Sequence, residues 1–187
     1  PGTDLQLQGT IPVAGTAPMS IVALGTVDLG IAQMLDPDIT SSGQLQFNID
    51  GSGRRANPNV QGQIKIVNAA LAGDSLPLGL QNGNGVLTLT NNRLEIDKFE
   101  GKVSSGTLTA KGGITYRPSI GFNLVVAATG TRTLYPSGVR EGIDANLTFV
   151  GSPQNSVLRG QVRLTELSFS PAFDLSDVIS AVGGTTG

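Results

Sequence analysis

The sequence contains no histidine, no cysteine and no tryptophan, and these absences remove whole classes of function. Without histidine and cysteine, the commonest general bases, thiolate nucleophiles and transition-metal ligands are missing. Ser-His-Asp triads and the usual zinc sites cannot be assembled. Disulfide bonds are excluded too, which fits a periplasmic chain and a cytosolic chain equally well. We therefore predict a protein that is not an enzyme, with no catalytic residue, no metal and no cofactor.

Aromatic residues, basic tracts and long apolar runs are also scarce. Aromatic residues make up 4% of a chain that is 39% apolar, so any apolar surface must be lined mainly by Leu, Val, Ile and Ala. No run approaches the roughly 20 apolar residues of a membrane-spanning helix. The formal net charge of −2, with no basic tract, makes nucleic acid a poor partner.

Apolar and polar residues alternate along most of the chain, which is the period of half-buried β-strands. The alternation predicts an all-β fold, an elongated and curved antiparallel-rich sheet with very little helix. Because few aromatic residues are available to fill the space above such a face, we expect a hydrophobic groove wide enough for an acyl chain. The predicted groove-lining residues are Leu45, Phe47, Ile49, Ile64, Ile66, Leu87, Leu89, Leu94, Ile96, Leu108, Ile114, Leu124, Val126, Leu147, Phe149, Val162 and Leu164.

In three strands the apolar residues change parity partway along. The change falls after Ile66, after Ile96 and after Leu164. A slip of one residue turns all later side chains to the wrong face unless an extra residue is inserted. We therefore predict a β-bulge or bend at each of these three places.

Glycine and asparagine clusters predict the turns between strands. They lie at 82–85, 91–92, 111–113 and 151–153. The glycines at 83 and 85 lack the third glycine and the following helix of a dinucleotide-binding loop, so a hairpin turn is the better prediction there.

Two short segments are the predicted helices. One runs from 29 to 35, with Asp28 as its cap, and the other from 174 to 182. A weak internal repeat relates residues 45–71 to residues 145–169, at an offset of roughly a hundred residues. We expect residues 1–187 to form a single repetitive β-trough segment of a longer protein.

Several short motifs have both a structural and a functional explanation. The carboxylates of Glu95 and Asp97 could form an acid–base pair, but a solvated strand face explains them better. The acidic stretches at 36–38 and 50–53 lack the full spacing of a calcium loop and are predicted to be turns. The pair at 54–55, two arginines, fits an exposed turn, although contact with a lipid headgroup or a partner stays open.

The runs at 62–69, 87–96, 99–101 and 106–112 resemble the TamB family and, more broadly, the AsmA-like envelope proteins. The resemblance consists of a recurring pattern of glycines and alternating strands over about residues 20–170, with no catalytic signature. It implies a periplasmic trough with a hydrophobic interior, in a protein anchored in the inner membrane by a helix outside this chain. It also implies an outer-membrane β-barrel partner, TamA or a BamA-like protein, and the movement of phospholipid towards the outer membrane.

The leading hypothesis is a lipid-transfer segment that shields phospholipid acyl chains between the two membranes and supports outer-membrane biogenesis. The first alternative is a chaperone or assembly module that receives β-strands of outer-membrane proteins at its sheet edges, together with a barrel partner. The second is an ordinary β-sandwich binding module with a filled core. The sequence leaves the identity of the lipid, its direction of travel and the oligomeric state open.

Overall fold

The computed structural model describes residues 2–14, 16–34, 36–73, 76–133 and 139–169. These residues form ten strands and one short 3-10 helix. In chain order they are β1 (Asp4–Thr10), β2 (Met19–Asp28), η1 (Leu29–Met34), β3 (Ile39–Arg54), β4 (Asn57–Gly73), β5 (Leu76–Leu89), β6 (Arg93–Val103), β7 (Gly106–Thr115), β8 (Gly121–Thr133), β9 (Val139–Gly151) and β10 (Ser156–Phe169).

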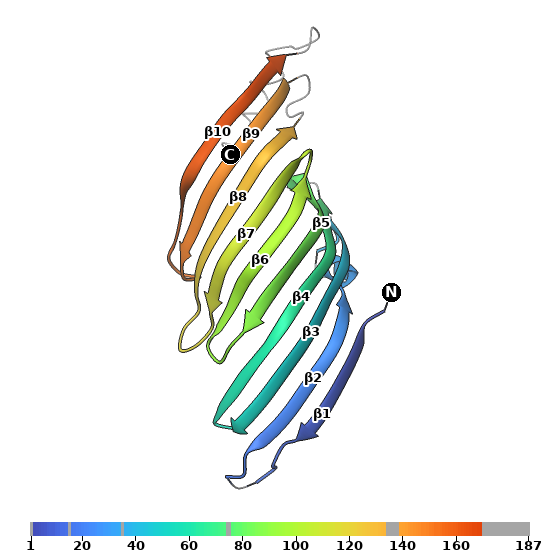
Figure 1. Cartoon of the computed structure of the whole chain (residues 1–187), viewed down its shortest axis with the longest axis vertical. Coiled ribbons are helices and arrows are strands. Elements are labelled where there is room, and N and C mark those ends of the chain that lie inside the picture. Colours follow the sequence, from blue (N-terminus) through green and yellow to red (C-terminus); the bar gives the residue numbers. More distant parts are fainter. Residues whose placement is uncertain (1, 15, 35, 74–75, 134–138, 170–187) are drawn as a thin grey trace.

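All ten strands belong to one antiparallel sheet in which every strand pairs with its neighbours in sequence. Figure 1 shows a single long, twisted and curved layer, with β1 at one end and β10 at the other. Nine strand spacings of about 4.8 Å give the sheet a width of roughly 43 Å. The predicted all-β trough is confirmed. The β-sandwich alternative is wrong for the described residues, because their strands form one open sheet and not two facing ones.

The three predicted changes of parity coincide with shifts of register between neighbouring strands. The shifts begin after Ile66 in β4, after Ile96 in β6 and after Leu164 in β10. At each place one strand contains an extra residue, so the side chains before and after it stay on the same face. The predicted bulges are therefore confirmed.

Two asparagines with left-handed backbone conformations form the bulges of β4 and β5. Asn68 has a φ of 51° and Asn82 a φ of 50°. The side chain of Asn84 connects them: its Oδ1 accepts a hydrogen bond from the Asn68 N–H at 3.1 Å, and its amide nitrogen donates to the Asn82 carbonyl at 2.8 Å. Asparagine tolerates positive φ better than most residues because its short polar side chain can hydrogen-bond locally. One side chain thus joins two adjacent bulges.

Three predicted turns are wrong. Residues 82–85 lie inside β5, residues 111–113 lie inside β7 and residues 50–53 lie inside β3. Glycine in these strands permits close packing and not a reversal of the chain. A Cβ on Gly85, for example, would lie 2.9 Å from Cδ2 of the Phe99 ring on β6. The turns at 36–38, 91–92 and 151–153 are confirmed, since each lies at the end of a strand or between two strands.

The short helix η1 confirms the helix predicted after Asp28. The Asp28 carboxylate accepts a hydrogen bond from the Gly30 N–H at 2.8 Å, as a capping side chain does. The Ser41 hydroxyl donates to the Leu29 carbonyl at 2.8 Å, which fastens η1 to β3. The second predicted helix, residues 174–182, lies outside the described residues.

Replacing Asn68 by valine should destabilise the sheet, because a β-branched residue is strained at positive φ. We expect Asn68→Val to lower the free energy of unfolding by about 1–2 kcal/mol. Asn68→Gly, which accepts the same φ, should change it by less than about 0.5 kcal/mol. Urea denaturation followed by circular dichroism measures both.

Asn48→Val is the matched control, since Asn48 is an exposed residue of β3 without positive φ. Equal losses of stability for Asn68→Val and Asn48→Val would show that the bulge does not hold Asn68 in the left-handed conformation.

Candidate functional site

The strand register places a continuous apolar row across the whole sheet. Side chains of directly paired residues point to the same face, so a row can be followed from strand to strand. The central row, from β1 to β10, consists of Leu5, Gly25, Phe47, Ile64, Leu87, Ile96, Gly112, Leu124, Phe149 and Leu158. No polar side chain interrupts it.

Further rows on the same face continue the apolar surface on both sides of the central row. On one side lie Leu7, Ala23, Ile49, Gly62, Leu89, Leu94, Ile114 and Phe122. On the other side lie Val27, Leu45, Ile66, Gly85, Phe99, Ala110, Val126, Leu147 and Gly160. The remaining three predicted residues, Leu108, Val162 and Leu164, lie beyond this last row on the same face. We refer to all these rows as the apolar face.

The apolar face therefore contains all seventeen residues that the alternation pattern predicted. It also contains residues that were not in the predicted lining, such as Leu5, Phe122 and Leu158. The alternation of apolar and polar residues in their own strands was the signal that could have placed them in the predicted lining. The glycines in these rows gave no such signal, because glycine in a sequence usually indicates a turn and not a strand residue.

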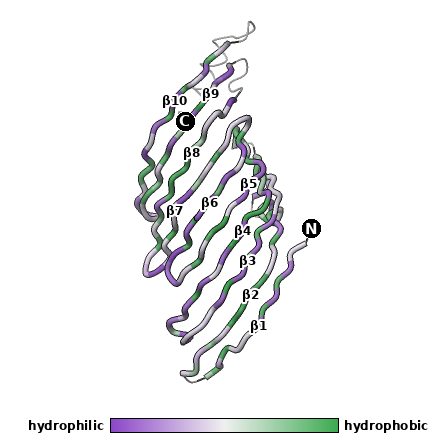
Figure 2. The backbone as a smooth tube through the Cα atoms, viewed as in Figure 1, coloured by the Kyte–Doolittle hydropathy of each residue, from purple (hydrophilic) through white to green (hydrophobic). Residues whose placement is uncertain are grey.

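The opposite face is mainly polar, although Leu24, Val86, Val125, Val150 and Val157 also lie on it. Gln46, Lys65, Lys111, Thr148 and Arg159 all project from it, since each lies one residue away from a member of the apolar face on the same strand. Figure 2 shows the resulting alternation of hydrophobic and hydrophilic residues along the strands. The sheet thus separates two chemically different surfaces with a single layer of backbone.

The apolar face is not buried by any described part of the chain. Ala69 and Val103 are the only buried hydrophobic residues among those described, and none of the described side chains is fully buried. Fifteen of the seventeen predicted residues are half-buried, while Val162 and Leu164 on the edge strand β10 are 60% and 57% exposed. The partial burial comes from contacts within one layer of side chains. A contiguous apolar surface of this kind is typical of an interaction site.

Glycines allow the largest side chains of this face to lie flat on the neighbouring strand. The Phe47 ring covers Gly25 of β2, where an added Cβ would lie 2.8 Å from Cζ. The Phe99 ring covers Gly85 of β5 in the same way. A Cβ at Gly25 would also lie 2.5 Å from the Asp4 carbonyl oxygen, and one at Gly85 would lie 3.0 Å from the Lys98 carbonyl oxygen, so neither position has room for a side chain. The apolar layer is therefore kept one side chain deep, which leaves the space above it open.

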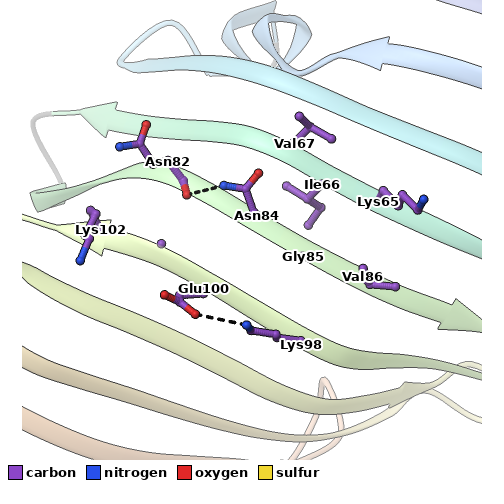
Figure 3. A pocket seen from close by; sticks show the side chains of 11 residues that line it. Lys65, Ile66, Val67, Asn82, Asn84, Gly85, Val86, Lys98, Glu100 and Lys102 are labelled. Carbon is purple, nitrogen blue, oxygen red and sulfur yellow. Dashed lines mark hydrogen bonds and ion pairs between the residues drawn. The ribbon is translucent and has the colours of Figure 1, made fainter.

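A hollow of about 460 Å³ lies on the polar face, between β4, β5 and β6 (Figure 3). Lys65, Lys98 and Lys102 project around it, and Val86 forms part of its floor. It lies on the other side of the sheet from the predicted groove.

The two carboxylates considered above for acid–base chemistry, those of Glu95 and Asp97, already have structural partners. Glu95 forms an ion pair with Arg93, and the Asp97 carboxylate accepts a hydrogen bond from the Thr88 hydroxyl at 2.6 Å. Among the described residues, no three His, Cys, Asp or Glu side chains come close enough together to hold a metal ion. In the same part of the chain, no helix has the length and apolar character needed to cross a membrane.

Of the arginines at 54–55, Arg54 ends β3 and Arg55 lies in the exposed turn that leads to β4, where the sequence predicted a turn. The Arg55 guanidinium donates a hydrogen bond to the Val13 carbonyl at 3.3 Å, which links this turn to the loop between β1 and β2. A contact with a headgroup or a partner stays a prediction.

A family model described as the TamB C-terminal domain matches residues 97–185. The match begins inside β6 and continues through β7, β8, β9 and β10. Of the runs that carry the resemblance in the sequence, 99–101 and 106–112 lie within the matched region, whereas 62–69 and 87–96 precede it. No curated protein and no solved structure matches the chain.

Replacing Gly85 by alanine should test whether the Phe99 ring lies on the neighbouring strand. The added methyl group would overlap the ring, and we expect a loss of about 1–3 kcal/mol in the free energy of unfolding. Introducing Phe99→Leu as well should recover part of this loss, because the smaller side chain can move aside. Denaturant unfolding of the single and double variants measures the coupling, and additive losses would contradict the contact.

Proposed function

We propose that the apolar face shields phospholipid acyl chains in transit between the inner and outer membranes. The match of residues 97–185 to the TamB C-terminal domain supports a role in outer-membrane assembly within the cell envelope. The central row, which crosses all ten strands without a polar side chain, is the observation that carries the proposal. The chain would act in the periplasm as part of a protein tethered to the inner membrane, and it would catalyse no reaction.

The energetics of lipid transfer explain why such a surface is useful. Moving acyl carbons from a bilayer into water costs about 0.8 kcal/mol for each CH₂ group. A lipid with about 30 such groups would then face a barrier on the order of 20 kcal/mol or more in free solution. Contact with an aliphatic surface removes part of this exposure, because the hydrocarbon leaves water on the side that touches the sheet.

The arrangement of the rows also supports movement along the sheet. An acyl chain that lies along a row meets similar aliphatic side chains at each strand spacing of about 4.8 Å. Its contact free energy therefore changes little from one strand to the next. A surface with one deep pocket would hold the lipid in a single place, whereas repeated shallow contacts permit stepwise transfer from β1 towards β10 or in reverse.

A second candidate function is supported by the open edges of the sheet. Within the described residues, β1 and β10 each pair with only one neighbour, so each has a row of backbone groups without a strand partner. An unpaired edge can accept an additional strand through main-chain hydrogen bonds. The chain would in this case receive strands of outer-membrane proteins, together with a β-barrel partner such as TamA or a BamA-like protein.

Photo-crosslinking distinguishes the two faces of the sheet. A photoreactive amino acid at Ile64 or Leu124, on the apolar face, should yield phospholipid adducts in cells, because the acyl chains would lie on these residues. The matched controls are Gln63 and Asn123, the preceding residues on the polar face of the same strands. We expect at least a tenfold excess of lipid adducts at the apolar positions, measured by mass spectrometry of the purified protein.

Equal yields at all four positions would mean that lipid contacts the sheet without preference for a face, and the proposed shielding would then be wrong. The same conclusion would follow if no position gave a lipid adduct while phospholipid was also absent from the native purified protein.

The second candidate makes a different prediction at the edge strand. A photoreactive residue at Gln161 of β10 should then give adducts with outer-membrane proteins, whereas the same residue at Gln63 in the interior strand β4 should not. Mass spectrometry of the adducts is again the measurement. Equal protein adducts at the edge and interior positions would argue against strand addition at β10.

A further inference from the structure

The sequence contains four lysines, Lys65, Lys98, Lys102 and Lys111, and all four lie close together on the polar face. They come from three strands, β4, β6 and β7, although the sheet has ten. The chain has a formal net charge of −2, so this concentration of positive charge does not follow from a basic composition. It is a local feature of one part of the polar face, where the carboxylates of Asp97 and Glu100 offset some of the charge.

The strand register fixes how three of these lysines surround a hollow. Lys65 pairs with Val86 of β5, and Val86 pairs with Lys98 of β6. The Cα atoms of Lys65 and Lys98 are therefore two strand spacings apart, roughly 10 Å, with an apolar residue between them. Lys102 projects from the same face of β6, four residues after Lys98. Figure 3 shows these side chains around the hollow of about 460 Å³.

The hollow has an apolar floor and a polar end. Val67 and Val86 contribute apolar surface, while Asn82 and Asn84 line the part nearest the two bulges. The hydrogen bond from the Asn84 amide to the Asn82 carbonyl holds this wall in place. The hollow is open on the side away from the sheet, so its apolar floor and its few fixed polar groups offer contacts to one side of a small molecule.

The positive charge around the hollow is only partly neutralised. Glu100 is the one acidic residue in its lining, and its carboxylate lies 3.4 Å from the Lys98 ammonium. The Lys102 ammonium donates a hydrogen bond to the Thr107 hydroxyl at 2.9 Å, which leaves its charge uncompensated. Among the described residues, Lys65 has no ion-pair partner. Three cationic side chains and one anionic side chain thus border the hollow, and the Lys102 ammonium is turned towards Thr107 of β7.

We propose that this hollow, the lysine cavity, binds a small amphipathic phosphate ester. The phosphate would lie between the ammonium groups of Lys65, Lys98 and Lys102, and the apolar part of the ligand would rest on Val67 and Val86. Such an ester could come from solution or be the headgroup region of an anionic lipid. The site lies on the opposite side of the sheet from the apolar face, so it does not depend on the proposed function.

Titration of the full chain with butyl phosphate tests the proposal, with inorganic phosphate and butanol as separate probes. Binding is followed by changes in the backbone amide signals in nuclear magnetic resonance spectra. We expect changes at residues 82–86 and 98–102, and butyl phosphate should bind at least tenfold more tightly than either of the other two probes. The triple variant Lys65→Gln, Lys98→Gln, Lys102→Gln should lower the affinity for butyl phosphate at least tenfold.

Two further variants separate the effect of the cavity lysines from that of positive charge elsewhere on the polar face, and from that of the apolar floor. Arg159→Gln with Arg163→Gln is the matched control, since these exposed residues lie on the polar face of β10, away from the cavity. This control should change the affinity by less than twofold. Val86→Thr keeps the size of the side chain but makes the floor polar, so it should remove the preference for butyl phosphate while binding of inorganic phosphate persists.

A flotation assay with vesicles that contain phosphatidylglycerol distinguishes the two sources of the ester. Vesicle binding that the triple variant loses and the arginine control retains would identify a lipid headgroup. Binding of butyl phosphate without vesicle binding would identify a soluble ester. The proposal is wrong if the triple variant binds butyl phosphate as the unchanged chain does, or if the arginine control loses binding to the same extent.

Discussion

Main-chain hydrogen bonding between antiparallel neighbours is the interaction on which the rest of this structure depends. The described residues contain almost no buried core, with Ala69 and Val103 as the only buried hydrophobic residues. A typical domain gains most of its stability from burying apolar side chains between layers. Here the ladder of backbone hydrogen bonds, each contributing about 0.5–1.5 kcal/mol, acts together with contacts inside one layer of side chains. The sheet can therefore leave one whole apolar face uncovered.

The alternation of residues was enough to predict an all-β sheet, the common face of the seventeen residues assigned to a groove, and the bulges after Ile66, Ile96 and Leu164. These predictions succeeded because a strand has a period of two and a parity change has only a few structural solutions. The glycines were misread where they lie inside strands, at Gly85 and Gly112. Sequence cannot distinguish a glycine that reverses the chain from one that makes room for a ring on the next strand, as Gly85 does, or for the backbone of the next strand, as Gly112 does. The lysine cavity was missed for a related reason, since only the strand register places Lys65 and Lys98 on either side of Val86.

The two faces of the sheet show how one thin layer can carry two kinds of chemistry. Hydrocarbon is favoured on one side, where Ile64 and Leu124 continue an aliphatic row. Positively charged side chains lie on the other side, where Lys65 and Lys98 flank Val86. Because successive residues of a strand point to opposite faces, the same strands supply both surfaces without an additional domain.

The purely sequential order of the strands has a consequence for how the chain acquires its structure. Every strand pairs only with the strands before and after it in the sequence, from β1 to β10. The contact order is therefore low for an all-β protein, and no long loop has to close before pairing can begin. Each new hairpin can add to the growing end of the sheet, so that the chain can fold progressively from one strand to the next.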